Sequence, residues 1–392
     1  MGDVIKDQSK LIVRTPEAFA KSGITVRLHT RVAAVKPEAQ TVVLAGGETV
    51  PFDYLVVATG AGPRLPKVPG LDVEGIFTLR NVSDAVRIKR FIQERRPQRA
   101  VAVGAGYISL EMCEAFRALG LETTVLESEA RPVLRFPEEF SVKIVEELQA
   151  NGVTFTPRVN LEGFDRSASG IVVRTGNGTI EADIVLIATG VAPEVRLAAE
   201  AGIALGGTGA IAVNGHQQTN LPFVYAAGDC CESYHRVSRK PVYIPLGDTA
   251  NKQGRIAGAN IGGQDVTFPG IVGSQCFKVF GLEVASTGLT EDEARQAGLT
   301  PVSATIQGVS RARSYPSTKR LWLKLVADTG TRRLLGAQAV GAEGVVTRIN
   351  ILASALAGGL SLDEIAYLDL AYAPPFSGSW DPVHIAAQEL LK

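Results

Sequence analysis

The sequence predicts an α/β protein in which one doubly wound domain is inserted into another and an α+β domain follows. An apolar strand that ends in Ala-Thr-Gly occurs twice, at residues 54–60 and 183–190. Between the copies lies a strand followed by Gly104-Ala-Gly106, and after them comes a strand that ends in Gly228-Asp229. Such units mark the carboxyl ends of buried parallel strands, so their order indicates two nested dinucleotide-binding domains.

Residues 1–82 are predicted to form the first part of the outer domain. We expect a helix at 15–21 and short strands at 24–28, 41–44 and 48–52. The continuous apolar run at 54–58 is typical of a strand that is buried on both faces. An extended connector follows, because Pro63, Pro66, Pro69 and Gly70 interrupt regular structure.

Residues 83–208 alternate between helices and strands, which predicts the inserted domain with a parallel sheet. The expected helices are 84–94, 107–119 and 138–150, and the expected strands are 99–103, 123–126 and 183–188. Residues 209–268 return to the outer domain, with a strand at 223–226 and a helix at 249–261. In residues 269–392, strands at 301–306, 320–326 and 335–340 precede a helix at 344–357, which indicates a separate α+β domain.

The composition excludes several classes of protein. The 392 residues are 45% hydrophobic, which allows two or three cores, and 40 basic residues balance 40 acidic ones. This balance disfavours nucleic-acid binding. No stretch approaches the roughly 20 apolar residues that span a bilayer, and the N-terminus lacks the pattern of a signal peptide. We therefore expect a soluble, cytoplasmic protein.

The cysteines and histidines do not indicate a metal site. Cys113, Cys230, Cys231 and Cys276 match neither a zinc pattern nor a disulfide framework, and the four histidines are scattered. We expect each cysteine to fill apolar space. A disulfide between the adjacent Cys230 and Cys231 is the less favoured alternative.

The loop that begins at Gly104 has the features of a nicotinamide-dinucleotide site. Gly104 allows a tight turn, and Gly106 lets the backbone approach a pyrophosphate at the N-terminus of the following helix. Ser109 replaces the third glycine, whose task is close packing of helix on strand. Glu127 ends the next strand, where a carboxylate binds the ribose hydroxyls and repels a 2′-phosphate. NADH is therefore favoured, although the nearby Arg131 leaves NADPH open.

The two Ala-Thr-Gly units predict a second cofactor contact. They bring the backbone at Thr59, Gly60 and Gly190 close to the edge of a sheet, although each is also compatible with an ordinary strand-to-loop exit. Asp229 follows Gly228 at a strand end, where its carboxylate can accept a hydrogen bond from a ribityl hydroxyl. The alternative role for Asp229 is a helix cap.

These motifs make the chain similar to the pyridine nucleotide-disulfide oxidoreductase superfamily, and to its coenzyme A-disulfide reductase and NADH oxidase branch. The resemblance is carried by residues 104–111, 219–229, 250–256 and 369–376, and it extends over essentially the whole chain. It implies FAD and NAD(P)H as cofactors, a small-molecule acceptor, and a homodimer formed through the C-terminal domain.

The resemblance also assigns roles to residues. Thr59, Gly60 and Asp229 would contact FAD. NADH would be bound by Gly104, Gly106, Glu111 and Glu127. Tyr107 would cover the flavin until nicotinamide displaces it. Tyr315 and Tyr372 would reach the active site of the partner subunit, and Asn251 and Trp380 would lie near the coenzyme A channel.

The chain departs from the family pattern at its start. Family members begin with a β-α-β unit that carries the flavin's own glycine loop and then a nucleophilic cysteine, and residues 1–5 match the segment just after that cysteine. We therefore expect an FAD domain that is truncated at its N-terminus and no matching nucleophile among the four cysteines. The leading hypothesis is transfer of hydride from NADH to FAD and reduction of a disulfide such as coenzyme A disulfide. The alternatives are an NADH oxidase, a persulfide reductase, or a non-catalytic NADH-binding dimer.

Overall fold

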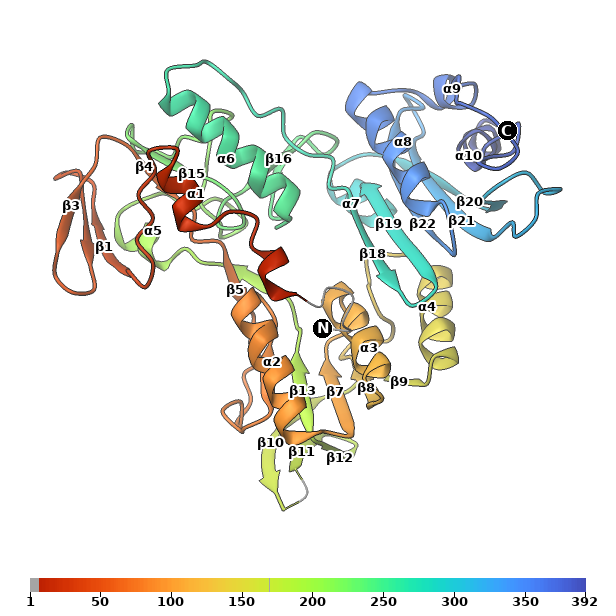
Figure 1. Ribbon diagram of the computed structural model, residues 1–392. Helices are drawn as coiled ribbons and strands as arrows, with labels where there is room; N and C mark the ends of the chain where they lie inside the picture. The colour runs from red at the N-terminus through yellow and green to blue at the C-terminus, as the bar shows by residue number, and fades with distance from the viewer. Residues whose placement is uncertain (1–6, 169) are drawn as a thin grey trace. The chain divides into compact units, whose positions relative to one another are not determined.

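The structure, a computed structural model, describes residues 7–168 and 170–392 (Figure 1). The chain forms two compact units. The first unit contains Pro63–Gly190 and Val272–Lys392, and the second contains the chain up to Gly62 together with Val191–Ile271. Residues 1–5, on which the truncation was predicted, lie outside the described part. Within the described ranges, no helix is both long and apolar enough to cross a membrane.

A five-stranded parallel sheet organises the N-terminal half of the first unit. Its order is β6 (Ile76–Thr78), β13 (Ile184–Ile187), β7 (Arg99–Val103), β8 (Glu122–Leu126) and β9 (Val153–Thr156). The helices between these strands are α2 (Val82–Arg95), α3 (Tyr107–Ala118) and α4 (Glu138–Ala150). The predicted parallel α/β sheet is confirmed, but the helices α2, α3 and α4 all pack on one of its faces, so the domain is not doubly wound.

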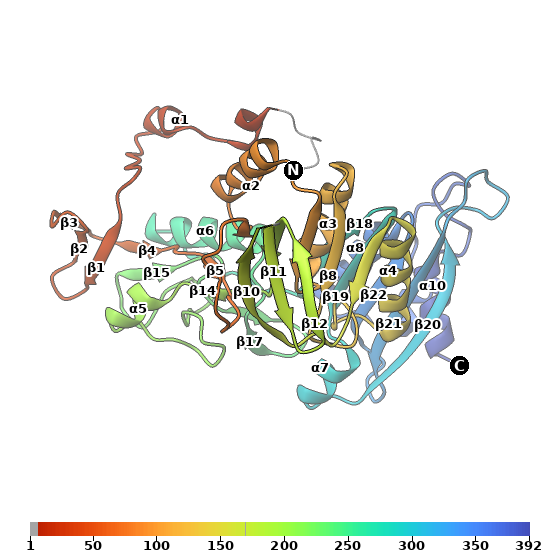
Figure 2. The same cartoon turned by 90° about the horizontal axis from the view of Figure 1, so that it is seen from below.

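Both faces of this sheet are buried. Along β7 and β13, successive apolar side chains point alternately to one face and to the other. On one face, Ile184 and Leu186 pack with Ile88 of α2 and Phe116 of α3. The other face is covered by a meander of β10 (Leu161–Ser167), β11 (Gly170–Thr175) and β12 (Gly178–Ala182), seen in Figure 2. Burial on both faces explains the continuous apolar sequence of these strands.

The C-terminal part of the first unit is an antiparallel sheet covered by helices. The strand order is β18 (Gln275–Val279), β19 (Leu282–Gly288), β22 (Leu334–Gly341), β21 (Arg320–Asp328) and β20 (Pro301–Val309). Helix α8 (Val345–Gly358) packs on β19 and β22, α10 (Pro382–Leu390) packs on β20 and β21, and the short helices are α7 (Glu291–Gln296) and α9 (Leu362–Ile365). Phe140 and Ile144 of α4 share a core with Phe277 and Val340 of this sheet, which joins the two halves.

The second unit is built around a parallel pair of β4 (Leu55–Val57) and β15 (Val224–Ala226). Next to it in sequence is an antiparallel sheet of β1 (Val32–Lys36), β2 (Thr41–Leu44) and β3 (Thr49–Pro51). The longest helix is α6 (Gly247–Ile261). The remaining elements are η1 (Gln8–Leu11), α1 (Pro16–Ala20), α5 (Arg196–Glu200), β5 (Ala61–Pro63), β14 (Val191–Pro193), β16 (Ser233–His235) and β17 (Lys240–Val242).

Two expectations for the second unit are wrong. Residues 24–28 are not a strand, because Ile24, Val26 and Leu28 are exposed and no described segment pairs with them. The run at 54–58 does form a strand, but only one of its faces is buried: Val57 is 4% exposed and Val56 is 40% exposed. Apolar composition indicates a strand, whereas its burial depends on elements that the local sequence does not specify.

Candidate cofactor sites

The loop from β7 to α3 has the geometry of a phosphate cradle. Gly104 has a φ of +94°, and a Cβ built on it would lie 2.6 Å from the carbonyl oxygen of Ala188, so only glycine fits. Gly106 is extended instead, and a Cβ there would meet no described protein atom within 4 Å. Gly106, the N-cap of α3, makes no side-chain cap hydrogen bond, and the positive end of the helix dipole at this position favours an anion. The loop therefore fits a dinucleotide pyrophosphate.

Ser109 lies fully buried on α3, at the position where the family fingerprint has a third glycine. Its hydroxyl has no hydrogen-bond partner among the described residues. Serine therefore permits the packing of α3 on the sheet but leaves one buried polar group unsatisfied.

Glu127 places its carboxylate at the same loop. One oxygen accepts a hydrogen bond from the N–H of Ala105 at 2.7 Å, and the other accepts from the N–H of Glu129 at 3.1 Å. The Arg131 guanidinium, by contrast, donates to the carbonyls of Phe136 and Leu134 and to the hydroxyl of Ser141. Arg131 is thus engaged with its own loop and with the start of α4, whereas the charged group that bonds to the backbone between the two glycines is the Glu127 carboxylate.

Tyr107 and Glu111 lie on α3 where this helix meets β18. The Tyr107 ring centroid is 6.3 Å from that of Phe277, and Tyr107 remains partly exposed. Burial raises the pKa of the Glu111 carboxyl, although a hydrogen bond from the backbone of Lys278 acts in the opposite direction. Both residues therefore lie on the helix that contacts β18, and both remain partly exposed to solvent.

The second unit brings the predicted flavin contacts to adjacent strand ends. The Ala227 N–H donates to the carbonyl of Val57 at 3.1 Å, so the carboxyl ends of β4 and β15 lie together. Thr59 donates its hydroxyl to the carbonyl of Glu194 at 2.6 Å, and Gly60 and Gly228 have φ values of +71° and +85°. The partly buried carboxylate of Asp229 follows this turn. A polar group at such an edge suits a ribityl chain.

Gln253 is a positioning residue that the sequence reasoning did not single out. It lies on α6, is 1% exposed, and accepts a hydrogen bond from the N–H of Gly228 at 2.9 Å. Its amide nitrogen donates to the hydroxyl of Ser233 at 3.0 Å. Because both ends of the amide are bonded, Gln253 fixes the turn that presents Asp229. Gln253 lies within residues 250–256, one of the segments that carry the family resemblance, and this was the sequence signal that could have pointed to it.

The other predicted site residues lie on loops or helix surfaces. Gly190 accepts a hydrogen bond from the N–H of Arg64 at 2.9 Å, at the end of the second Ala-Thr-Gly unit. Asn251 is exposed on α6 of the second unit. Tyr315, Tyr372 and Trp380 are partly exposed on loops of the C-terminal part of the first unit.

All four cysteines are free thiols, and three of them are buried. Burial raises the pKa of Cys113 to about 12, which keeps it protonated and unreactive. A hydrogen bond from the Cys231 thiol lowers the pKa of its neighbour Cys230 to about 6, yet both thiols lie in an apolar core. Cys276 is exposed on the outer side of β18, so the expectation of apolar filling is wrong there.

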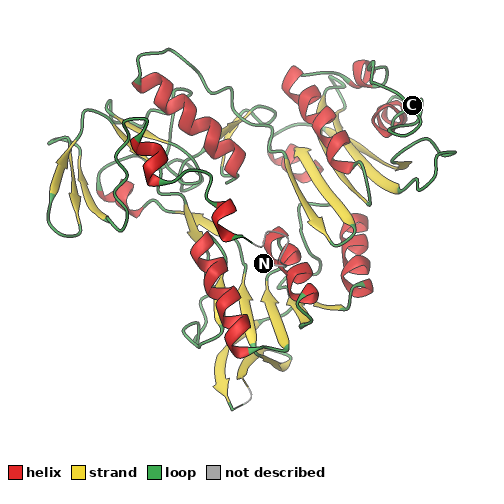
Figure 3. Cartoon of the chain, viewed as in Figure 1, coloured by secondary structure: helices red, strands yellow, loops and turns green. Residues whose placement is uncertain are grey.

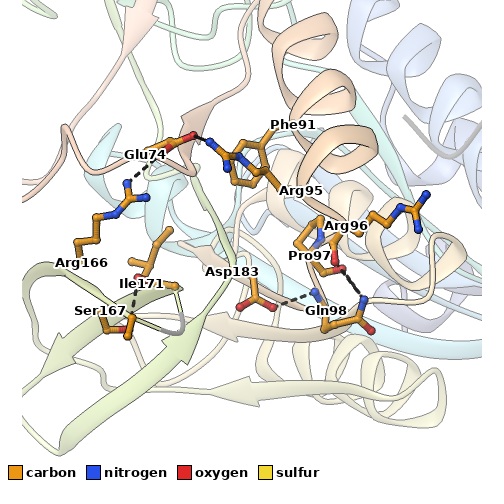
Figure 4. A pocket seen from close by; sticks show the side chains of 12 residues that line it. Glu74, Phe91, Arg95, Arg96, Pro97, Gln98, Arg166, Ser167, Ile171 and Asp183 are labelled. Atoms are coloured by element: carbon orange, nitrogen blue, oxygen red, sulfur yellow. Dashed lines mark hydrogen bonds and ion pairs between the residues drawn. The ribbon is translucent and has the colours of Figure 1, made fainter.

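A pocket of about 400 Å³ lies at the amino ends of the parallel strands, away from the glycine loop at their carboxyl ends (Figure 4). Its floor includes Gln98 and Asp183, which precede β7 and β13, and the Gln98 N–H donates to the Asp183 carboxylate at 2.8 Å. The Glu74 carboxylate bridges Arg95 at 2.6 Å and Arg166 at 3.1 Å. Dinucleotides bind at the carboxyl ends of such strands, so this pocket is separate from the glycine loop.

Comparisons with known proteins agree with this arrangement. A family model described as pyridine nucleotide-disulphide oxidoreductase matches residues 5–254, and the dimerisation domain of that family matches residues 274–383. The chain therefore belongs to the pyridine nucleotide-disulphide oxidoreductase family and is an enzyme that uses FAD and NAD(P)H. Because the first match starts at residue 5, a missing flavin-binding segment is not shown, and the truncation stays a prediction.

Three relatives illustrate the similarity. The NAD(P)H sulfur oxidoreductase (CoA-dependent) of Pyrococcus furiosus is 39% identical over 392 residues, which cover 98% of this chain and 88% of that protein. The coenzyme A disulfide reductase of Staphylococcus haemolyticus is 30% identical over 392 residues, or 98% of this chain and 87% of that protein. A NAD-dependent persulfide reductase from A. fulgidus has a TM-score of 0.96 and 35% identity, covering 100% of this chain and 74% of that one.

Proposed function

We propose that the protein uses NADH to reduce a sulfur–sulfur bond, with coenzyme A disulfide as the leading substrate. The overall reaction is RSSR + NADH + H⁺ → 2 RSH + NAD⁺, so two electrons and two protons reach the separated sulfurs. The observation that carries the proposal is the glycine loop, where Gly104 makes the turn and Gly106 leaves space for phosphate beside Glu127.

Residues of the first unit would bind NADH, and residues of the second unit would bind FAD. Gly106 and the N-terminus of α3 would hold the pyrophosphate of NADH, while Glu127 would accept hydrogen bonds from its ribose. Preference for NADH over NADPH is supported by the engagement of Arg131 with its own loop and the start of α4. Asp229 would accept a hydrogen bond from the ribityl chain of FAD. When bound, FAD supplies the two-electron chemistry that links nicotinamide to the acceptor.

The C-terminal domain would form a homodimer and present Tyr315 and Tyr372 to the acceptor in the partner subunit. Their hydroxyls would donate hydrogen bonds to the acceptor and orient it. The partial exposure of both rings supports this role, since 36% of Tyr315 and 55% of Tyr372 remain accessible in one chain. Asn251 and Trp380 would contact the coenzyme A part of the substrate.

A sulfur compound other than coenzyme A disulfide is the second candidate for the acceptor, because the names of the relatives refer to more than one form of sulfur. The name of the P. furiosus protein favours sulfur and that of the A. fulgidus protein favours a persulfide. Oxygen is the alternative acceptor, because other relatives are named NADH oxidases.

A single set of assays separates these functions. Purified protein is supplied with FAD, and NADH oxidation is followed by absorbance with coenzyme A disulfide, polysulfide or oxygen as the sole acceptor. With coenzyme A disulfide as the acceptor, the proposal expects two thiols to be released for each NADH that is oxidised. A protein that binds NADH but oxidises none with any of the sulfur acceptors would overturn the proposal.

A further inference from the structure

The two loops that carry Tyr315 and Tyr372 are joined to each other. Tyr315 lies on residues 310–319, between β20 and β21, and Tyr372 lies on residues 366–381, between α9 and α10. Both are drawn in green, as loops, in Figure 3. The N–H of Ala312 donates to the carbonyl of Pro374 at 3.1 Å, which is a direct backbone link between the loops.

One buried ion pair lies at the base of both loops. Arg348 projects from α8, is 4% exposed, and donates to the Asp381 carboxylate at 2.8 Å. The same Arg348 nitrogen also donates to the carbonyl of Ser310, at the start of the first loop, at 3.1 Å. It further donates to the carbonyl of Phe376, within the second loop, at 3.4 Å. A single guanidinium therefore contacts both loops.

Asp381 completes the connection on its side. Its carboxylate accepts the hydroxyl of Ser377 at 2.7 Å and the N–H of Val383 at 3.0 Å. These bonds tie the end of the second loop to the first turn of α10. Both charged groups thus have hydrogen-bond partners beyond each other, which is the condition under which a buried pair specifies one geometry.

A branch of the same network reaches the ring of Tyr315. The Arg311 guanidinium lies 5.8 Å from the centre of that ring and pairs with the Glu343 carboxylate. Glu343 also accepts the hydroxyl of Ser310 at 3.0 Å, and the hydrogen bond from Arg311 lowers its pKa. Tyr315 is therefore held through Ser310, the residue whose carbonyl Arg348 contacts.

We propose that Arg348 is a positioning residue that fixes the loops of Tyr315 and Tyr372 relative to each other for the acceptor. The proposal rests on the proposed function, in which these hydroxyls face the substrate. A buried ion pair adds little net stability compared with apolar packing, so its bonds to two loops are better explained by geometry than by stability. Lysine at this position keeps the positive charge, but its single ammonium group lacks the planar, forked N–H donors of a guanidinium. It therefore cannot reach the carboxylate and both loop carbonyls at once.

The test compares Arg348→Lys with Leu352→Ala, a substitution of a fully buried residue on the same helix that touches neither loop through a hydrogen bond. In the FAD-supplied protein, Arg348→Lys should lower kcat for the acceptor by about 10-fold to 100-fold, as expected for displaced positioning groups. The rate at which NADH reduces the bound flavin should stay unchanged. If Leu352→Ala, at an equal loss of thermal stability, slows the acceptor step as much, Arg348 has only a structural role.

A second readout does not depend on turnover. In a Trp322→Phe background, Trp380 is the single tryptophan, and it precedes Asp381 directly. Arg348→Lys should shift the Trp380 emission and speed proteolysis within residues 366–380, whereas Leu352→Ala should do neither. Unchanged emission and proteolysis would overturn the positioning role. If Tyr315→Phe and Tyr372→Phe leave acceptor reduction intact while these loop signals move, the proposed role of the tyrosines fails and the loop connection stands.

Discussion

Alanine at Gly106 should weaken NADH binding without weakening the fold. Gly106 has a φ of −80° and a ψ of 174°, which alanine adopts freely, and its Cβ would meet no described atom within 4 Å. Alanine is the poorer N-cap by up to about 1 kcal/mol, but it also restricts the unfolded chain by about 0.4–1 kcal/mol. These terms offset each other, so the free energy of unfolding should change by less than about 0.5 kcal/mol.

The effect on the cofactor should be much larger. The new methyl group occupies the space through which a phosphate approaches the N–H groups of α3. Losing one hydrogen bond to a charged group costs about 1.5–3 kcal/mol, which corresponds to a Kd for NADH roughly 10-fold to 150-fold higher.

The matched control is Gly104→Ala in the same loop. There the φ of +94° and the 2.6 Å approach to the Ala188 oxygen make alanine costly in the free protein, by about 2–5 kcal/mol in total. Calorimetric titration with NADH and thermal unfolding without it measure the two effects separately. The reasoning is refuted if Gly106→Ala binds NADH normally, or if it melts as early as Gly104→Ala in the absence of ligand.

Three further predictions concern other residues. Glu127→Gln should raise the affinity for NADPH relative to NADH by at least about tenfold, because like charges placed together cost several kcal/mol; an unchanged ratio of the two Kd values would contradict the assigned role of the carboxylate. Gln253→Leu removes the acceptor of the Gly228 N–H at a cost of about 1–3 kcal/mol and should release FAD during gel filtration, whereas Gln253→Glu, which keeps an acceptor oxygen, should retain more of it. Burial raises the pKa of Cys113 from 9.0 to about 12, so the unfolded chain loses this proton first as the pH rises. The contribution of Cys113 to stability should be complete below pH 9 and decline between pH 9 and 12, and urea unfolding of Cys113→Ala, which lacks that decline, checks this.

The domain that carries the glycine loop was accessible to sequence reasoning because its signals are local. A buried strand, Gly104, Gly106 and the acid at Glu127 lie within one β-α-β unit, and the helix and strand bounds were correct to within two residues. The strand expected at 24–28 fails because alternating apolar residues need a pairing partner, which sequence pattern alone does not provide. Gln253 was missed for a related reason, since a glutamine within a helix has no special meaning until its contacts are known.

The sequence by itself determined the family and the place of the glycine loop between a strand and a helix, because each depends on residues close together in the chain. Only the tertiary structure decided that Arg131 is engaged with its own loop and the start of α4, that Gln253 supports Gly228, and that Arg348 connects two loops that are distant in sequence. The bonds of Gln253 and Arg348 join groups that are distant in sequence, and all three side chains are charged or buried polar groups. Their partners are chosen by packing, and the free energy of burying such groups unpaired makes that choice strict.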